Sequence, residues 1–241
     1  MGSGGSKAAK PTKPPTRNPM GEWTREEALA DIDSHLAKDN FTRERFAELR
    51  PYHETSWNPS VESGVQAGHP APDGKAVHLD GSPTSLHTQL GDSAMPVILC
   101  FGSVTCPPFR LMFAKQVMGV ANTFTGRVRV QFIYIKEAHP TDEWSLGINV
   151  QQEVARPQCV TIEDRIAAAK KLLELQPDLK DNLILDSMAN ELNEAYATMS
   201  SRLYVVHKGR VVYQGHVGPY ELSPECLKTF LGNFFAHNPD G

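Results

Sequence analysis

Residues 96–108, PVILCFGSVTCPP, carry the strongest indication of the fold. The first six, PVILCF, form a continuous apolar run, which is typical of a strand buried on both faces of a sheet. A short loop follows, and Pro107 and Pro108 then open a segment with helical spacing of apolar residues as far as Val120. Proline is favoured in the first turn of a helix, because no N–H partner is lost there. Cys106 is therefore predicted to lie at a helix N-terminus directly after a core strand.

This position gives Cys106 a predicted chemical role. Unpaired N–H groups and the helix dipole stabilise an anion at a helix N-terminus. We therefore expect a lowered thiol pKa and a nucleophilic sulfur, with a buried structural cysteine as the alternative. Phe109 stands three residues later, so the C-x-x-C pair of a dithiol exchanger is missing. The peroxidatic pattern P-x-x-x-[ST]-x-x-C is met at Ser103 but not at Leu99, where it requires proline.

Further strands and helices are predicted on both sides of this stretch. In chain order they are a strand at Ala76–Leu79, a buried strand at Val128–Ile135, a helix from Thr161, a core strand at Leu183–Leu185, a hairpin of Leu203–His207 with Arg210–Gln214, and a helix near Ser223–Phe235. Crossover connections give parallel strands, whereas the hairpin gives an antiparallel edge. The order predicts an α/β sandwich with a mixed central sheet, of the thioredoxin-like type.

Composition limits the classes of protein to consider. The 241 residues are 22% charged and 40% hydrophobic, which fits a soluble globular chain. A net charge of −4 argues against a nucleic-acid partner. With no run of about 18 apolar residues and no signal peptide, we expect an intracellular, non-secreted protein with free thiols. The cysteines and histidines lack paired ligand spacing, so neither a metal site nor a tightly bound cofactor is expected.

The chain divides into four predicted regions: a basic, disordered leader (1–20), a helical N-terminal extension (21–64), a thioredoxin-like catalytic domain (65–236) and a C-terminal tail (237–241). The leader begins MGSGGS, which matches the N-myristoylation pattern with Gly2 as the acylated residue. Its basic residues would supply the second signal that stable membrane attachment needs. A flexible Gly/Ser leader has the same sequence. The protein is expected in the cytoplasm, or on the cytoplasmic face of a membrane through this lipid.

A second group of polar residues follows the strand that ends near Ile135. Strand alternation would point Tyr134 and Glu137 to opposite faces, but a loop from Ala138 could bring Glu137 and His139 to one site. A carboxylate beside an imidazole can act as a proton relay. The alternative is a surface glutamate followed by a loop histidine.

Arg202 opens the first strand of the hairpin. In a thioredoxin-like sheet the start of that strand lies beside the nucleophile loop, and thioredoxins usually place a cis-proline there, whereas this chain has Ser201-Arg202. An arginine could hold a thiolate or a substrate carboxylate. The alternative is an exposed cation on an edge strand.

Two of these segments resemble the signatures of the iodothyronine deiodinase family. FGSVTCPPF at residues 101–109 is similar to the selenocysteine loop of that family, and YIKEAHPTDEW at 134–144 is similar to its second signature. Four shorter segments follow in the family's order: IEDR (162–165), LDSMAN (185–190), RLYV (202–205) and YQG (213–215). The resemblance covers roughly Val65 to Phe235. It implies a thioredoxin-like fold with an insertion around the EAHP segment that shapes the substrate site.

The resemblance also implies a reaction, the reductive removal of iodine from an iodothyronine-like aromatic ring in thyroid hormone metabolism. Cys106, at the position of the family's selenocysteine, would attack the iodine atom. Arg202 would hold the carboxylate of the substrate, and His139 would also contact the substrate. The ring carbon would gain its proton through a relay formed by Glu137, His139, Tyr134, Ser103 and Thr105. A thiol reductant would serve as cosubstrate, and a homodimer is usual in the family.

The sequence departs from the family pattern in ways that affect function. Sulfur in place of selenium predicts a slower nucleophile, and Cys159 stands where the family often has a histidine. Cys159 is predicted to be the resolving thiol for Cys106, with a spectator thiol as the alternative. Two other functions remain open: a peroxiredoxin-like thiol peroxidase using Cys106, Ser103 and Arg202, and a non-catalytic iodothyronine-binding protein.

Overall fold

A computed structural model of the chain describes residues 64–91, 94–143, 145–216 and 222–238. The predicted leader with Gly2, the extension up to residue 63 and the end of the predicted tail lie outside these residues. Of the helices described, none combines the length and the apolar character needed to cross a bilayer.

The centre of the domain is one seven-stranded sheet in the order β2-β1-β5-β4-β3-β6-β7. Strands β3, β4 and β5 run parallel to one another. On one side β6 pairs antiparallel with β3 and with β7, and on the other β1 pairs antiparallel with β5 and with β2. The strands are β1 (Lys75–Val77), β2 (Pro83–Ser85), β3 (Val97–Gly102), β4 (Arg129–Tyr134), β5 (Leu183–Asp186), β6 (Arg202–His207) and β7 (Arg210–Gln214). This mixed sheet with helical crossovers is the predicted thioredoxin-like fold.

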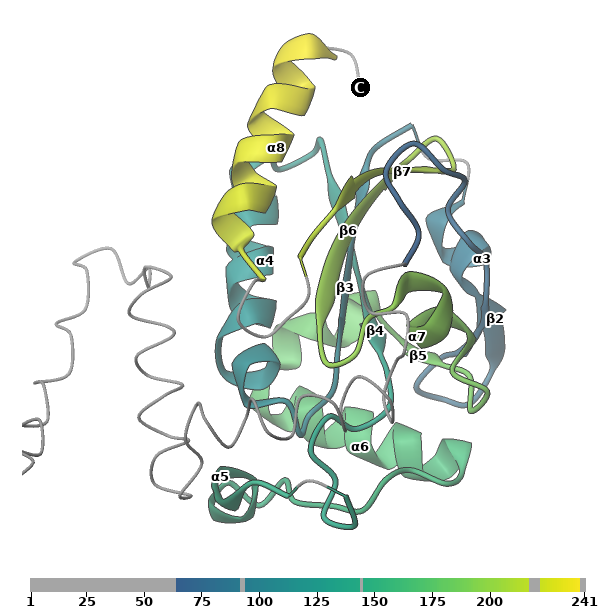
Figure 1. Ribbon diagram of the computed structural model, residues 1–241, viewed down its shortest axis with the longest axis vertical. Coiled ribbons are helices and arrows are strands. Elements are labelled where there is room, and N and C mark those ends of the chain that lie inside the picture. The colour runs from purple at the N-terminus through teal and green to yellow at the C-terminus, as the bar shows by residue number, and fades with distance from the viewer. Residues whose placement is uncertain (1–63, 92–93, 144, 217–221, 239–241) are drawn as a thin grey trace, which may run out of the picture.

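Helices pack around this sheet. They are α3 (Leu86–Leu90), a π-helix η1 (Phe109–Phe113), α4 (Ala114–Thr123), α5 (Gly147–Gln151), α6 (Ile162–Leu175), a 3₁₀ helix η2 (Pro177–Asn182), α7 (Glu191–Tyr196) and α8 (Pro224–His237). Figure 1 shows α4 and α8 side by side along one flank of the sheet. Helices α6 and α7 both contact β5. The central strands are therefore covered, and all six residues of β3 are buried.

The predicted central elements are confirmed, with small shifts at their ends. The apolar run from Val97 forms the predicted strand because parallel strands buried on both faces need continuous apolar sequence. A capping box fixes the start of α6: the Thr161 side chain accepts from the Asp164 N–H at 3.2 Å, and the Asp164 carboxylate accepts from the Thr161 N–H at 2.9 Å. The final helix, predicted near Ser223–Phe235, continues to His237.

Two glycines have specific roles in this fold. Gly209 and Lys208 form the two-residue turn of the β6–β7 hairpin, and their φ angles of 71° and 49° are those that a tight hairpin needs. Gly102 ends β3, where an added Cβ would lie 2.3 Å from the Phe109 ring. The strand therefore needs glycine at this point so that the first turn after Cys106 can pack against it.

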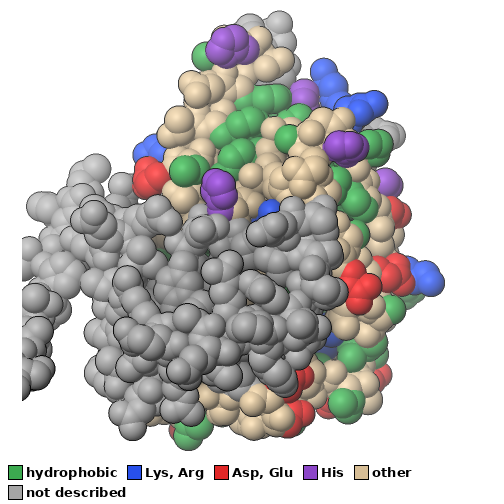
Figure 2. Space-filling model, in the orientation of Figure 1, with side chains coloured by type: hydrophobic (Ala, Val, Ile, Leu, Met, Phe, Trp, Pro, Cys, Tyr) green, Lys and Arg blue, Asp and Glu red, His purple; other side chains and the backbone are tan. Residues whose placement is uncertain are grey.

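Apolar side chains also reach the surface near the hairpin. Tyr213 of β7 and Phe230 of α8 are half-buried, with ring centroids 4.9 Å apart. Figure 2 shows hydrophobic side chains gathered in this upper part of the molecule, where α8 and β7 lie in Figure 1. These rings join α8 to the antiparallel edge of the sheet.

Candidate active site

The Cys106 loop connects the end of β3 to η1. The Cys106 N–H donates to the Ser103 carbonyl at 3.2 Å, and the Cys106 carbonyl accepts from the Arg110 N–H at 3.0 Å. Cys106 therefore directly precedes the first helical turn, as predicted. The Cys106 Sγ lies 3.9 Å from the Ser200 Oγ, just before β6. This contact confirms that the start of β6 lies beside the loop; the Met199–Ser200 peptide there is cis.

The electrostatic surroundings of Cys106 differ from the prediction. Its side chain is fully buried, and this burial raises the pKa of the Cys106 thiol above its ordinary value. A hydrogen bond from the Phe109 N–H, contact with Ser200 and attraction to Arg110 oppose the rise in pKa, but burial outweighs them. The prediction of a lowered pKa was wrong, because desolvation disfavours the charged form of the thiol more strongly than the helix N-terminus favours it.

Glu137 is the centre of a buried hydrogen-bond network beside this loop. The Tyr134 hydroxyl donates to its Oε1 at 2.5 Å, and the Thr105 hydroxyl donates to its Oε2 at 2.5 Å. The Thr105 N–H also donates to Oε2, at 3.3 Å. All three side chains are fully buried. Burial and the neighbouring Glu137 hold the pKa of Tyr134 well above its usual value, so the phenol keeps its proton.

Glu137 and Tyr134 meet because the strand ends before Glu137. Strand β4 stops at Tyr134, and the alternation that would separate these two side chains stops with it. The Gln158 side chain then holds the backbone of Glu137: its Oε1 accepts from the Glu137 N–H at 2.8 Å, and its Nε2 donates to the Glu137 carbonyl at 3.1 Å. The alternative of a surface glutamate is therefore wrong.

Ser103 and Thr105 bind the backbone that follows Glu137. The Ser103 Oγ accepts from the Ala138 N–H at 3.1 Å, and the Thr105 Oγ1 accepts from the His139 N–H at 3.2 Å. His139 is almost fully buried, with 8% of its surface exposed. The two segments singled out from the sequence are thus joined, and the predicted relay residues lie in one cluster.

Arg202 lies inside the sheet rather than at its edge. It is opposite Phe101 of β3 in the register and is 5% exposed, so the alternative of an exposed edge cation is wrong. Its Nε donates to the Gly215 carbonyl at 2.9 Å and its Nη1 to the Ala197 carbonyl at 3.2 Å. Burial lowers the pKa of Arg202, and the nearby Tyr204 opposes this effect.

Cys159 also contacts the Glu137 carboxylate. Its Sγ is 3.8 Å from Glu137 Oε1, and burial together with this carboxylate raises the pKa of the Cys159 thiol to about 12. Cys100 is buried within β3, and no disulfide joins any of the cysteines in the described residues. The predicted role of Cys159 as a resolving thiol stays a prediction.

The sequence analysis missed a second buried arginine at the site. The Arg110 guanidinium donates to the Val104 carbonyl, to Asn149 Oδ1 at 3.1 Å and to Gln152 Oε1 at 2.5 Å. The Asn149 Nδ2 donates in turn to the Thr105 carbonyl at 2.9 Å. A lone cation in the otherwise apolar stretch FRLMF, four residues after Cys106, was the available signal.

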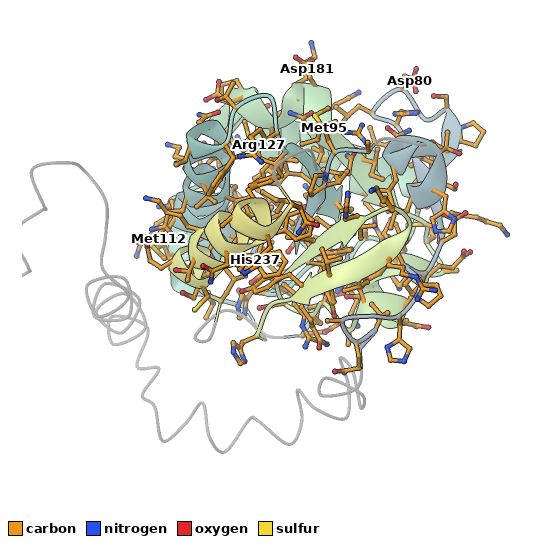
Figure 3. The ribbon with its side chains drawn as sticks, turned by 90° about the horizontal axis from the view of Figure 1, so that it is seen from above. Asp80, Met95, Met112, Arg127, Asp181 and His237 are labelled. Atoms are coloured by element: carbon orange, nitrogen blue, oxygen red, sulfur yellow. The ribbon has the colours of Figure 1, made fainter. Side chains whose placement is uncertain are left out.

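No other group in the described residues suggests a competing centre. No cluster of three or more metal-ligating side chains is found within them. A cavity of about 340 Å³ is lined by His78, Asp80, Lys180 and Asp181, among others, but it lies at the amino ends of β4 and β5. In Figure 3, Asp80 and Asp181 lie along one edge of the molecule, and Met112 of η1 lies at another. The cavity is thus separate from the Cys106 loop.

Comparison with known proteins identifies the family. The family model described as iodothyronine deiodinase matches residues 28–235, which is most of the chain. The chain belongs to the iodothyronine deiodinase family. It is 35% identical over 183 residues to the type I iodothyronine deiodinase of Xenopus laevis, with 76% of this chain and 69% of that protein covered. It is 34% identical over 167 residues to the thyroxine 5-deiodinase of Rattus norvegicus, with 69% of this chain and 53% of that protein covered.

Solved structures align with this chain at low sequence identity. The thioredoxin domain of a thiol-disulfide oxidoreductase from Bacteroides vulgatus superposes with a TM-score of 0.48 at 16% identity, covering 71% of this chain and 99% of that chain. A peroxiredoxin-like protein from Aquifex aeolicus gives a TM-score of 0.46 at 11% identity, covering 72% and 90%. The chain spans only about half the length of the rat deiodinase.

Proposed function

We propose that this protein is a thiol-dependent reductive deiodinase of iodothyronine-like aromatic substrates, with Cys106 as its nucleophile in the place of selenocysteine. The observation that carries the proposal is the buried network of Glu137, Tyr134 and Thr105 directly beside the Cys106 loop. Through Thr105, this network places groups that can move a proton beside the proposed sulfur nucleophile, and these are the two requirements of reductive dehalogenation. Family membership adds independent support.

In the proposed first half-reaction, the Cys106 thiolate attacks the iodine atom of the substrate. The sulfur–iodine bond forms while the carbon–iodine bond breaks, and the electron pair of the broken bond stays on the ring carbon. That carbon takes up one proton and is reduced, while the sulfur is oxidised to a sulfenyl iodide. The hydrogen-bonded chain of Tyr134, Glu137 and Thr105 would deliver the proton, with Ser103 and His139 holding its geometry.

The second half-reaction requires a thiol reductant. A thiolate attacks the oxidised sulfur, iodide leaves, and a mixed disulfide with Cys106 forms. A second thiol then attacks this disulfide and restores Cys106 while the two reductant sulfurs are joined. Both steps balance, because each turnover consumes two thiols and one aryl iodide and gives one disulfide, one aryl hydrogen and one iodide with its proton.

Cys159 is proposed to make the first attack on the oxidised Cys106 sulfur from within the chain, so that iodide leaves and a Cys106–Cys159 disulfide forms. Two reductant thiols then reduce this disulfide, and the overall balance is unchanged. The Cys159 sulfur contacts one oxygen of the Glu137 carboxylate, and the hydroxyl of Thr105 contacts the other. Thr105 is the residue directly before Cys106. Mild oxidation should then give a Cys106–Cys159 disulfide that is detectable by peptide mass mapping and absent from a Cys159→Ser variant. A map of the oxidised protein without that link would contradict this role.

Substrate binding requires the site to open. Cys106 and Glu137 are both fully buried, so the segments around them must separate before an aromatic ring can reach the sulfur. Arg202 is proposed to bind the substrate carboxylate, and it would then exchange the Ala197 carbonyl for that ligand. Opening also exposes the thiol to water, which would lower its pKa toward the ordinary value.

The placement of the protein in the cell is proposed from the sequence alone. Acylation of Gly2 and the basic leader would hold the chain on the cytoplasmic face of a membrane, and a homodimer is proposed from the family. Mass spectrometry of the N-terminal peptide from a eukaryotic host would detect the acyl group. An unmodified glycine would leave the protein in the cytoplasm.

The direct test is iodide release from thyroxine by the purified protein with excess dithiol, with Cys106→Ser as the control. Release that is lost in the control supports the proposal. If no iodide is released but peroxide is consumed in a Cys106-dependent way, the protein is a thiol peroxidase instead. If thyroxine binds and neither reaction occurs, the protein is a binding protein.

A further inference from the structure

Arg110 is a buried cation with an unusual set of partners. It lies one helical turn after Cys106 and only 1% of its surface is exposed. Its side-chain partners are the Val104 carbonyl, Asn149 and Gln152, all of them neutral oxygen acceptors. Within the described residues, no carboxylate lies within ion-pair distance of the Arg110 guanidinium. A buried charge without a counterion is costly, and an apolar side chain of similar volume would cost less.

These partners connect the nucleophile loop to α5. Arg110 binds the carbonyl of Val104, and Asn149, which also binds Arg110, donates to the carbonyl of Thr105. The carbonyls of the two residues immediately before Cys106 are therefore held by one guanidinium–amide pair. Helix α5 lies at the same end of the molecule as the lower ends of β3 and β4 in Figure 1. The Arg110–Asn149 pair thus joins the Cys106 loop to α5, a helix that is distant in the sequence.

The charge of Arg110 persists under ordinary conditions. Burial lowers the pKa of Arg110 to about 10, and attraction to Cys106, Tyr134 and Glu137 opposes a further fall. The guanidinium is therefore protonated at neutral pH. Because the surroundings are poorly solvated, its field is screened less than that of a surface cation.

We propose that Arg110 is a positioning residue for Cys106: with Asn149 it fixes the loop that carries the thiol, and its buried positive charge favours the thiolate over the thiol. The consequence for turnover rests on the proposed function, whereas the effect on the sulfur does not. Arg110 would act through the loop and through its field, without touching the substrate.

Other groups near Cys106 would act against the thiolate. Cys100 of β3 interacts electrostatically with Cys106, and Glu137 and Tyr134 interact electrostatically with Arg110. Ser200 and Ser201, just before β6, are uncharged. Without the Arg110 charge, the thiolate would keep the penalty of burial and lose this attraction. Removal of the charge should therefore raise the pKa of Cys106.

Arg165 provides a matched control for a purely structural role. It is also 1% exposed, and its guanidinium likewise donates to neutral oxygens: the carbonyls of Asp186 and Ser187 at 2.9 and 2.7 Å, and Asn190 Oδ1 at 2.8 Å. These partners follow β5 rather than β3. Replacing Arg165 thus removes an equivalent buried guanidinium away from the Cys106 loop.

The test is the pH profile of iodoacetamide alkylation at Cys106, followed by peptide mass mapping of the full-length protein. The midpoint of this profile reports the thiol pKa, because only the thiolate reacts. Arg110→Gln should raise the midpoint by about one pH unit or more, the effect expected for loss of a nearby opposite charge. Arg110→Lys should stay within about half a unit of the parent because the charge is kept. Arg165→Gln should leave the midpoint unchanged.

Two results would overturn the proposal. One is an Arg110→Gln midpoint equal to that of the parent protein, and the other is an equal rise in Arg165→Gln. If circular dichroism shows that Arg110→Gln does not fold, Arg110→Lys decides, and a rise of a full unit or more in that variant contradicts the role of the charge. The titration uses no thyroxine, so an inactive protein with the expected shift would contradict the proposed function and not this inference.

Discussion

The loops after β3 and β5 lie on either side of β4 and are built from similar parts. Both strands run parallel to β4, so both loops leave the same edge of the sheet. Each loop has its carbonyls held by a buried arginine, Arg110 after β3 and Arg165 after β5. In the β5 loop, the Asp186 carboxylate accepts the N–H groups of Leu192 at 3.0 Å and of Asn193 at 2.8 Å, at the start of α7. The carboxylate oxygens of Asp186 therefore anchor the start of α7.

The β3 loop uses its polar groups differently. The carboxylate beside it, Glu137, is bound by two hydroxyl groups and lies near the thiol of Cys159. The Cys106 sulfur lies 3.9 Å from the Ser200 hydroxyl, which is a long contact. A buried arginine is therefore present in both loops and does not by itself distinguish them. The difference is the thiol beside a chain of exchangeable protons, which we propose makes the β3 loop the functional one.

The largest expected difference between the two loops is in catalysis. Glu137→Gln keeps the size of the side chain but removes the carboxylate that can accept and release a proton, so we expect deiodination to fall by about 10²–10⁴-fold, the usual contribution of a general acid or base. Asp186→Asn should change stability but leave the rate per folded molecule within a few-fold of the parent. Initial rates corrected for the folded fraction by circular dichroism measure both. Equal losses in the two variants would remove the distinction between the loops.

The pH dependence of stability should be set partly by the β5 loop. Burial raises the pKa of Asp186 to about 6 from 3.8, although its two N–H donors oppose this. The folded state then binds a proton more tightly than the unfolded state, so the free energy of unfolding falls as the pH rises through this window, by roughly 3 kcal/mol. Urea titrations across the window should show the fall in the parent and not in Asp186→Asn. A fall of the same size in both proteins would assign it to other groups.

A smaller effect is expected where β3 ends. Gly102→Ala places a Cβ against the Phe109 ring, so we expect a destabilisation of about 1–3 kcal/mol from overpacking. The matched control is Gly119→Ala in α4, where an added Cβ meets nothing within 4 Å and alanine should be neutral or stabilising by up to about 1 kcal/mol. Thermal unfolding of both variants measures the difference. If Gly102→Ala is as stable as the parent, the close approach of strand and helix is not needed.

The sequence was sufficient to predict the parts of the fold that local pattern determines. Three local patterns each specify one element: the apolar run from Val97 a buried strand, the capping box at Thr161 a helix start, and Lys208-Gly209 a hairpin turn. The short helices α5 and α7 and the strand β2 were missed, because elements of three to six residues carry no measurable periodicity.

The candidate site was predictable in part of its membership, whereas Arg110 and the electrostatics were not. Parallel strands end at the same edge, so Cys106 and Glu137 could be expected to lie near each other. The direction of the Cys106 pKa could not, because it depends on how many atoms of other segments cover the sulfur. The same reason explains why Arg110 was missed, since its partners in α5 come from about forty residues further along the chain.

The most direct test of the central claim is a single-turnover experiment without reductant. Thyroxine is added in excess over the purified protein, samples are quenched at intervals, and the deiodinated product is quantified against the amount of Cys106. We predict product formation up to one equivalent per Cys106, no further product until dithiol is added, and none in Cys106→Ser. Continued turnover without a thiol, or equal product formation in Cys106→Ser, would contradict a mechanism in which the Cys106 sulfur takes the iodine.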